Sequence, residues 1–345
     1  MKKYKRILIA GFILLCAFLL TLVTAVLIFR FIKHSRLYQA GQMATPTKDT
    51  KYTDLMDRLE SDTSRSPAKS PSLNTGGTEL HKEEPTETAV PARFQREALE
   101  LAVAEVLEPN GSPWIVYAES LTSKDIAIYG KDATATDQMI AASMIKIFIM
   151  AAAYDQVEQG SIPESDLSED IFSMITVSDN NAANRVTKRL GNGDASLGRQ
   201  TVTDFARSIG CPGVEHNRLM LEDNGTQNYV SAADCARLLR MIYEGDCISS
   251  ERSAQMLEVL LAQRDHDYIP AGVPDEVAVA HKGGDLMNCQ GDVGIVFSES
   301  GPYIVCIISN SVFSEANTKA IGQVSALIFH AMNEEYGEAS VKPKD

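Results

Sequence analysis

The 345-residue sequence is poor in the signals that mark several protein classes. Its six cysteines are ordinary usage for this length and exclude a small disulfide-stabilised fold. It has no glycine-rich phosphate loop, no G-x-S-x-G element and no internal repeat. Basic residues are in the minority, with 32 Lys and Arg against 46 Asp and Glu, which argues against capture of nucleic acid by the bulk of the chain. With 44% hydrophobic residues, the chain is still apolar enough to build a folded domain.

The first 36 residues contain seven Lys and Arg side chains and no acid. Between these charges, residues 7–29 form an apolar run with only two threonines as polar side chains. A helix of this length would be about 35 Å long, which is enough to cross a hydrocarbon core of about 30 Å. We therefore predict a transmembrane signal anchor at 7–29, with residues 1–6 in the cytoplasm and the rest of the chain outside the cell membrane. A cleaved signal peptide is the alternative, but its apolar region is usually only about 7–15 residues long and ends in small residues.

Residues 37–93 are predicted to be a disordered tether. Ser, Thr and Pro make up 19 of the 53 residues in 41–93, and Tyr52 is the only aromatic residue there. Such a composition cannot build a core. From residue 94 the pattern becomes periodic, and we expect one domain over 94–337. Five cysteines fall in it, an odd number without metal-type spacing, so at least one thiol has no partner in the domain and we expect most to be buried.

Hydrophobic periodicity and turn residues predict the elements of this domain. Helices are expected over 94–107, 143–159, 168–177, 181–190, 201–209, 231–243, 250–262 and 316–334, and strands over 114–120, 125–129, 277–282, 292–298 and 303–309. Strands at both ends with helices between them indicate an α/β (α+β) fold, with an antiparallel sheet built from both ends of the domain and a helical insert. We expect a sheet lobe over 94–140 and 265–337, a helical lobe over 141–264, and a site between them.

Ser143 and Lys146 are the first candidates for chemistry. At spacing i, i+3 on a helix their side chains share one face, so the amine can reach the hydroxyl. A serine hydroxyl needs a base to become a nucleophile, and a lysine can serve if burial or another cation lowers its pKa. Ser66 and Lys69 in the tether have the same spacing, so spacing alone is weak. The alternatives are a helix cap for Ser143 and a solvated Lys146, and the apolar neighbours of Lys146 disfavour the second.

Two further motifs follow along the chain. Ser178-Asp179-Asn180 lies at the junction of two predicted helices, where a hydroxyl can relay a proton and an amide can bind a carbonyl; a plain helix cap is the alternative. His281-Lys282-Gly283-Gly284 ends a predicted strand, where glycines let a backbone N–H approach a ligand and the lysine supplies a positive charge; an ordinary turn is the alternative. The histidines have no metal-type spacing, and nothing in the motifs calls for a cofactor.

Taken together and in this order, the three motifs resemble the S-x-x-K, S-D-N and K-T-G set of class A β-lactamases and penicillin-binding proteins. Ala182-Ala183-Asn184 continues the second motif as in class A enzymes, and residues 205–210 look like the helix before their omega loop. The resemblance covers residues 94–337. It implies a β-lactamase/transpeptidase-like fold.

The resemblance also implies catalytic roles. Ser143 would be the acylated nucleophile and Lys146 its base. Ser178 would relay a proton to the leaving nitrogen. Lys282 would anchor the substrate carboxylate and help to keep Lys146 neutral through like-charge repulsion.

Asn180, Gly284 and Asp285 are implied to form the substrate-binding part of the site. Asn180 would contact the substrate amide. The backbone N–H groups of Ser143 and Asp285, next to Gly284, would form an oxyanion hole, the kind of stabilisation that is often the largest single contribution to catalysis.

Two positions depart from the family pattern. Gly283 stands where the third motif normally has a hydroxyl residue, so one hydrogen bond to the substrate carboxylate is missing. Counting on from Gly210, Arg218 falls on the family's loop arginine and Met220 on the glutamate that positions the deacylating water. Glu222, two residues on, is the candidate deacylation base, and Glu215, five residues before, is a second. If neither reaches the acyl ester, acylation could be intact while release by water is slow.

The sequence therefore predicts a membrane-anchored, extracytoplasmic serine hydrolase that opens a β-lactam or a related cell-wall amide or ester through an acyl-enzyme on Ser143. Its partners would be this small-molecule substrate and the membrane, and no nucleic acid. One alternative is a D-Ala-D-Ala peptidase of the penicillin-binding type. The other is a slow-deacylating or inactive module that binds or senses β-lactams or wall peptides.

Overall fold

The computed structural model describes residues 95–333. The predicted anchor at 7–29 and the tether at 37–93 lie outside these residues. Within residues 95–333, no helix combines the length and the apolar character needed to cross a membrane.

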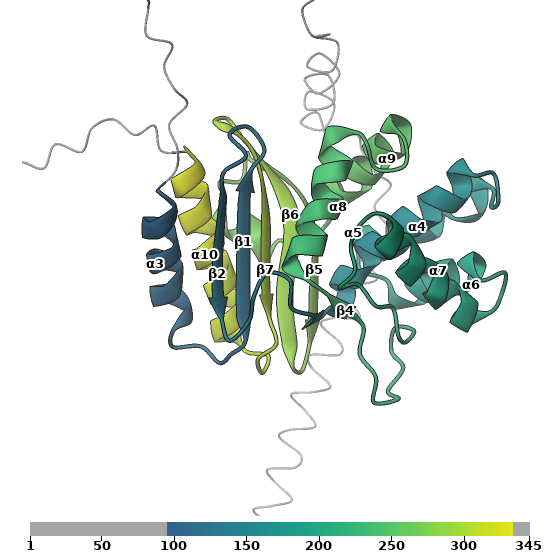
Figure 1. The fold of residues 1–345 in the computed structure, drawn as a ribbon, viewed down its shortest axis with the longest axis horizontal. Coiled ribbons are helices and arrows are strands. Elements are labelled where there is room, and N and C mark those ends of the chain that lie inside the picture. Colours follow the sequence, from purple (N-terminus) through teal and green to yellow (C-terminus); the bar gives the residue numbers. More distant parts are fainter. Residues whose placement is uncertain (1–94, 334–345) are drawn as a thin grey trace, which may run out of the picture. The chain divides into compact units, whose positions relative to one another are not determined.

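Five antiparallel strands form the main sheet, in the order β2-β1-β7-β6-β5 (Figure 1). Their bounds are Trp114–Ser120 for β1, Ile126–Lys131 for β2, Ala278–Leu286 for β5, Cys289–Ser298 for β6 and Gly301–Ser309 for β7. Strand β1 pairs with β7, so that Trp114 lies opposite Ser309 and the two ends of the domain meet in the middle of the sheet. This confirms the predicted sheet from both ends of the domain.

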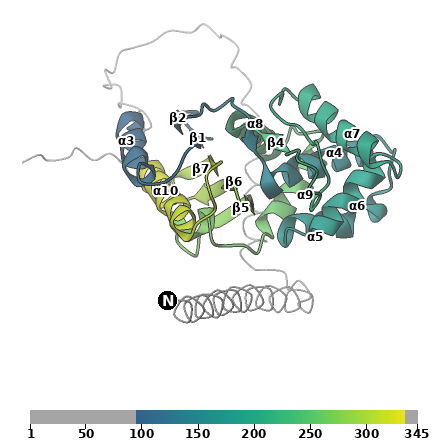
Figure 2. The same ribbon diagram turned by 90° about the horizontal axis from the view of Figure 1, so that it is seen from below.

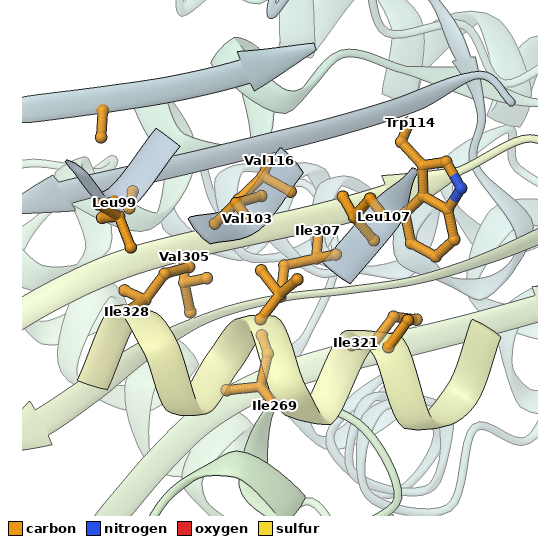
Figure 3. Packing of buried hydrophobic residues seen from close by; sticks show 14 of the residues in the cluster. Leu99, Val103, Leu107, Trp114, Val116, Ile269, Val305, Ile307, Ile321 and Ile328 are labelled. Atoms are coloured by element: carbon orange, nitrogen blue, oxygen red, sulfur yellow. The ribbon is translucent and has the colours of Figure 1, made fainter. Parts of the chain in front are cut away.

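One face of the sheet is covered by α3 (Arg96–Leu107) and α10 (Glu315–Asn333). Their buried side chains join those of β1 and β7 in one core (Figure 3). The core includes Leu99, Val103, Leu107, Trp114, Val116, Val305, Ile307, Ile321 and Ile328. Full burial of one such aliphatic side chain contributes about 1.5–3 kcal/mol, so this cluster holds the two terminal helices on the sheet.

The opposite face is covered by α8 (Ala232–Glu244), which packs against β1, β6 and β7. Side chains alternate along a strand, so Tyr117 and Glu119 of β1 point towards α8. The buried Glu119 carboxylate accepts hydrogen bonds from Arg240 Nε at 2.7 Å and from the Tyr117 hydroxyl at 2.8 Å. Because both faces are covered, six of the seven residues of β1 are buried.

The other helices gather beyond strand β5 (Figure 2). They are α4 (Lys146–Glu158), α5 (Ser168–Thr176), α6 (Asn180–Leu190), α7 (Ala195–Ser208) and α9 (Ser250–Leu261). Helix α4 is central, because it packs against all four of the others. Its residues from Lys146 to Tyr154 are all buried, as expected for a helix that is apolar on every side. A lysine at its first position is therefore drawn into the protein interior.

The predicted elements are found, with differences that have local causes. The helix expected from residue 143 begins instead as a short 3-10 turn, η1 (Ala142–Ile145), which leads into α4. Helix α7 begins six residues before the expected start, because the Asp194 side chain caps it by accepting from Ser196 N at 2.6 Å. Ser231 caps α8 by accepting from Asp234 N, and the Asp234 carboxylate accepts from Gly213 N.

Several short elements and extensions were not predicted. Strand β5 continues past the expected end at 282 through two glycines that indicate a turn when read alone. The two-residue strands β3 (Met139–Ile140) and β4 (Tyr229–Val230) pair with each other and are too short to show periodicity. Two further 3-10 turns are η2 (Glu164–Asp166) and η3 (Ile269–Gly272). The five cysteines of residues 95–333 are all free and buried, whereas the sequence predicted only that at least one is unpaired and that most are buried.

Candidate active site

Ser143 lies in η1, at the junction between the sheet and the helical lobe. The residue before it, Ala142, has a φ of +43°, a left-handed conformation that costs a non-glycine residue about 1–3 kcal/mol. Such strain persists only where the surrounding structure imposes it, and it is common beside reacting groups. Ser143 itself is half-buried, whereas its neighbours Met144 and Ile145 are fully buried. The turn therefore places Ser143 towards the surface, while the side chains of Met144 and Ile145 pack in the protein interior.

The Lys146 side chain is fully buried and points at the second motif. Its Nζ donates to the Ser178 carbonyl oxygen at 2.7 Å, to Ser178 Oγ at 3.0 Å and to Asn180 Oδ1 at 2.8 Å. Within the described residues, no hydrogen bond joins Lys146 to Ser143 Oγ. The fold thus brings Lys146 of the first motif to Ser178 and Asn180 of the second, with the amine one helical turn from Ser143. Catalytic hydrogen bonds often tighten only when substrate is bound.

Burial lowers the pKa of Lys146 well below its ordinary value, and the positive charge of Lys282 lowers it further. Asp179 and Asp285 act in the opposite direction with smaller effects. A neutral amine keeps two N–H donors and one lone pair. The Ser178 carbonyl and Asn180 Oδ1 can accept the two donors, and the lone pair can accept a proton from a neighbouring hydroxyl. Lys146 therefore has the properties of a general base.

The second motif occupies the turn between α5 and α6. Asp179 caps α6, because its Oδ1 accepts from Asn181 N at 2.7 Å and from Ala182 N at 3.0 Å. Ser178 adopts a left-handed φ of +56°, which directs both its carbonyl and its hydroxyl towards Lys146. The helix-cap interpretation thus holds for Asp179, while the flanking serine and asparagine bind the lysine.

The third motif lies on β5, the edge strand next to η1. Lys282 is buried, its Nζ donates to the Gly283 carbonyl oxygen at 2.6 Å, and burial lowers its pKa to about 8. A Cβ atom on Gly284 would lie 2.6 Å from Ser143 N and 3.0 Å from Met144 N. The strand therefore meets the backbone of the serine turn with only a glycine hydrogen between them. This contact brings the third motif to the first.

The loop after α7 carries the residues predicted for deacylation. The Asn184 amide of α6 receives a hydrogen bond from Met220 N at 2.7 Å and donates to the Met220 carbonyl oxygen at 3.0 Å. Glu222 is exposed, and its carboxylate accepts from Leu219 N at 3.0 Å within the loop. The Glu215 carboxylate accepts from Asn217 Nδ2 at 3.1 Å. Neither carboxylate hydrogen-bonds to Ser143, Lys146 or Ser178 within residues 95–333.

Sequence reasoning gave no role to three buried residues beside Lys282. The Tyr268 ring lies against Gly283, and Asp292 of β6 lies opposite Gly283 in the strand register. His281 Nδ1 lies 2.9 Å from Asp292 Oδ2. Asp292 is the first residue of a predicted strand. A charged side chain at a position expected to be buried was the sequence signal that could have identified it.

A separate polar cavity of about 260 Å³ lies between α7 and the following loop, away from the motifs. Arg199, Thr203 and His216 are among the residues that line it. Burial, and then the charge of Arg199, lower the pKa of His216 to about 3. No group of His, Cys, Asp and Glu side chains in the described part of the chain could hold a metal ion.

Fold and site geometry define a class of protein: an α+β serine hydrolase fold of the β-lactamase and penicillin-binding-protein type. Solved structures of this class superpose on the chain. A β-lactamase from Sphaerobacter thermophilus matches with a TM-score of 0.60 at 21% identity, covering 69% of this chain and 98% of its own. The penicillin-binding protein PBP-A matches with a TM-score of 0.61 at 23% identity, covering 71% and 98%. At these identities the likeness concerns the fold.

The family follows from the sequence comparison. The model of the Beta-lactamase enzyme family matches residues 98–172 and 164–332, and the chain belongs to this family. The β-lactamase FAR-1 of Nocardia farcinica is 30% identical over 152 residues, which are 42% of this chain and 47% of that protein. The chain thus matches about half the length of this curated relative.

Proposed function

We propose that this protein is a serine hydrolase that forms an acyl-enzyme on Ser143, with a β-lactam or a related cell-wall amide or ester as its substrate. The observation that carries the proposal is the buried Lys146 amine. It has a lowered pKa, lies one helical turn from Ser143 and is held by Ser178 and Asn180. A buried lysine held in this way has no evident structural purpose and suits a base.

The proposed reaction uses side chains of the first two motifs and the backbone that follows the third. Lys146 Nζ takes the proton of Ser143 Oγ while this oxygen attacks the substrate carbonyl carbon. The oxyanion that forms accepts hydrogen bonds from the backbone N–H groups of Ser143 and Asp285. The bond to the leaving group breaks as the proton reaches that group through the Ser178 hydroxyl, and Asn180 contacts the substrate amide. Water then hydrolyses the ester on Ser143.

A slow-deacylating variant of this function is the second candidate, and one observation favours it. The side-chain amide of Asn184 hydrogen-bonds to the backbone of Met220, which stands at the position of the family's glutamate. The nearby Glu222 carboxylate accepts a hydrogen bond from Leu219 N. Because neither Glu215 nor Glu222 hydrogen-bonds to Ser143 within the described residues, the acyl-enzyme would persist. Such a protein would act as a D-Ala-D-Ala peptidase of the penicillin-binding type, or as a sensor of β-lactams or wall peptides. A variant of PBP-A has been solved as an acyl-enzyme complex with penicillin G.

We further propose that residues 7–29 anchor the chain in the cell membrane and that the domain acts on its outer side. The uncharged run of 23 residues, its basic flanks and the acidic remainder of the chain support this placement.

Labelling with a fluorescent penicillin tests the proposal. Lasting label on Ser143 supports a slow-deacylating enzyme, and rapid turnover supports a β-lactamase. A folded protein that is not labelled would contradict the proposal that Ser143 reacts with penicillins. Lys146→Ala is expected to abolish labelling. Lys188→Ala, which removes an exposed lysine of α6, is the matched control and should label like the wild type. Labelling of Lys146→Ala at the wild-type rate would disprove the role of Lys146.

A further inference from the structure

The space beside Gly283 is already filled by other residues of the chain. A Cβ atom on Gly283 would lie 3.1 Å from Cδ2 and 3.4 Å from Cε2 of the Tyr268 ring, and 3.6 Å from Asp292 Oδ1. The first of these distances is tighter than ordinary van der Waals contact. Tyr268 is itself buried. The hydroxyl residue of the family pattern is therefore missing here because the position is occupied, and no hydroxyl can be regained without moving Tyr268.

Asp292 places a buried carboxyl group at this position. Its side chain is fully buried and receives hydrogen bonds from Ile269 N at 3.1 Å and from His281 Nδ1 at 2.9 Å. His281 Nε2 is buried without a partner in the described part of the chain. The tautomer with its proton on Nδ1 avoids a buried, unpaired N–H group, which would cost about 1–3 kcal/mol. These contacts hold the carboxylate next to Gly283, its partner in the strand register.

Negative charge outweighs positive charge around Lys282. The carboxylates of Asp292, Asp265 and Asp285 each favour the protonated form of this lysine, so all three lie close enough to act on it. Asp265 and Asp285 are exposed, whereas Asp292 is buried and is screened least by solvent. The charges of three carboxylates thus act on one ammonium group, against the larger effect of its burial. A substrate anion that approached it would meet a cation whose charge is already compensated.

We propose that the Lys282 end of the site accepts a neutral or cationic group of the substrate, in place of the carboxylate that the family's third motif implies. This inference rests on the proposed acyl-enzyme function and specifies its substrate class. The preferred acyl donor would be an amide or ester whose leaving side carries no free carboxylate. A penicillin, which carries a carboxylate on this side, would acylate Ser143 more slowly than such a donor. Three residues would determine this specificity. Tyr268 and Asp292 fill the space beside Gly283, and Asp285 contributes its negative charge.

Three depsipeptide esters with the same acyl part test the proposal on the full-length protein. Their leaving hydroxy acid ends in a free carboxylate, a carboxamide or an aminoethylamide. The second-order rate of acylation of Ser143 is measured by intact-protein mass spectrometry at low ionic strength. The carboxamide and the cationic amide are expected to react about tenfold faster than the carboxylate, and the cationic advantage should shrink with added salt because exposed charges are screened.

Asp285→Asn is expected to reduce the ratio of the acylation rate of the cationic ester to that of the anionic ester. The variant keeps the backbone N–H and removes one negative charge. Asp267→Asn removes an exposed acid of the same loop as Asp265 and should leave the ratio unchanged. A carboxylate ester that reacts as fast as the carboxamide would overturn the inference and leave the acyl-enzyme function standing. Failure of all three esters to acylate a folded protein would contradict the acyl-enzyme function itself.

Discussion

Lys146 and Lys282 are almost fully buried, and burial is the largest cause of the lowered pKa of each. A buried ammonium costs folding free energy unless it is well paired. Lys282 has one hydrogen bond, to the Gly283 carbonyl, within residues 95–333. Residues that lower stability in this way are typical of sites selected for chemistry.

Replacing Lys282 with Met is expected to stabilise the fold while impairing acylation. The pKa of Lys282 falls from its ordinary value of 10.5 to about 8, so the charged form costs up to about 3 kcal/mol in the folded state. Below pH 8 both states carry the proton and the folded state bears this cost. Between pH 8 and 10.5 the folded state has released the proton and the unfolded state still holds it, so wild-type stability gains.

Urea unfolding of Lys282→Met and wild type over pH 7–10.5 measures this effect. The stability difference should be largest at pH 7 and should vanish near pH 10.5. A difference that is independent of pH would mean that packing and not charge is responsible.

Met220→Glu is expected to speed hydrolysis of the acyl-enzyme. The Met220 backbone is held by both atoms of the Asn184 amide, so a carboxylate at this position would be anchored beside the site. A positioned general base contributes roughly 10²–10⁴-fold. The decay of label on Ser143 measures the rate of acyl-enzyme hydrolysis. The control is Met220→Gln, whose side chain has the shape of glutamate without its charge. Equal decay in both variants would exclude this position as the site of a base.

At the scale of elements, the site depends on the contact between strand β5 and turn η1. Gly284 is the residue that permits it, because an added Cβ would meet the Ser143 backbone at 2.6 Å. Helix α6 also positions parts of the site. Asn180 in its first turn binds Lys146, and Asn184 in its second turn binds Met220 in the loop after α7. The positions of three elements thus decide whether the motifs can act together.

Gly284→Ala is expected to displace β5 from η1 and to reduce acylation roughly 100-fold, because small misplacements of reacting groups have effects of this size. Gly283→Ala is the matched control, since its Cβ would meet the edge of a side-chain ring and not the backbone. Its acylation should fall much less. Circular dichroism and thermal unfolding must show that both variants fold, and an unimpaired Gly284→Ala would show that the contact does not matter.

At the scale of the whole molecule, charge divides along the chain. Residues 1–36 carry seven basic groups and no acid, and the remainder carries 25 Lys and Arg against 46 Asp and Glu. The bulk acidity therefore belongs to the tether and the domain. The excess of acid extends to the neighbourhood of Lys282, where the carboxylates of Asp265, Asp285 and Asp292 act on one ammonium group.

The full-length chain is expected to sediment with membranes and to be released by detergent but not by high salt. A chain that begins at residue 94 should be found in the soluble fraction and should label with penicillin at the full-length rate. Cell fractionation with immunodetection measures the distribution. A full-length protein found in the soluble fraction would contradict the anchor.

The sequence by itself determined the elements of the fold and the three motifs. Apolar periodicity and helix-stop glycines are local properties, which is why α3, β1, α8 and α10 lie where they were predicted. The buried environment of Lys146 could also be predicted, because the apolar residues around it are neighbours along the chain.

Only the tertiary structure decided how the motifs meet. Lys146 bonds to residues 32 and 34 positions away, and Gly284 touches a turn formed far earlier in the chain. Tyr268 fills the space beside Gly283, and Asp292 becomes its neighbour through strand register. Distances of this kind are fixed by packing between elements, and no local pattern encodes them. The sequence thus predicted a missing hydroxyl at Gly283, and the fold supplied the ring and the carboxylate that take its place.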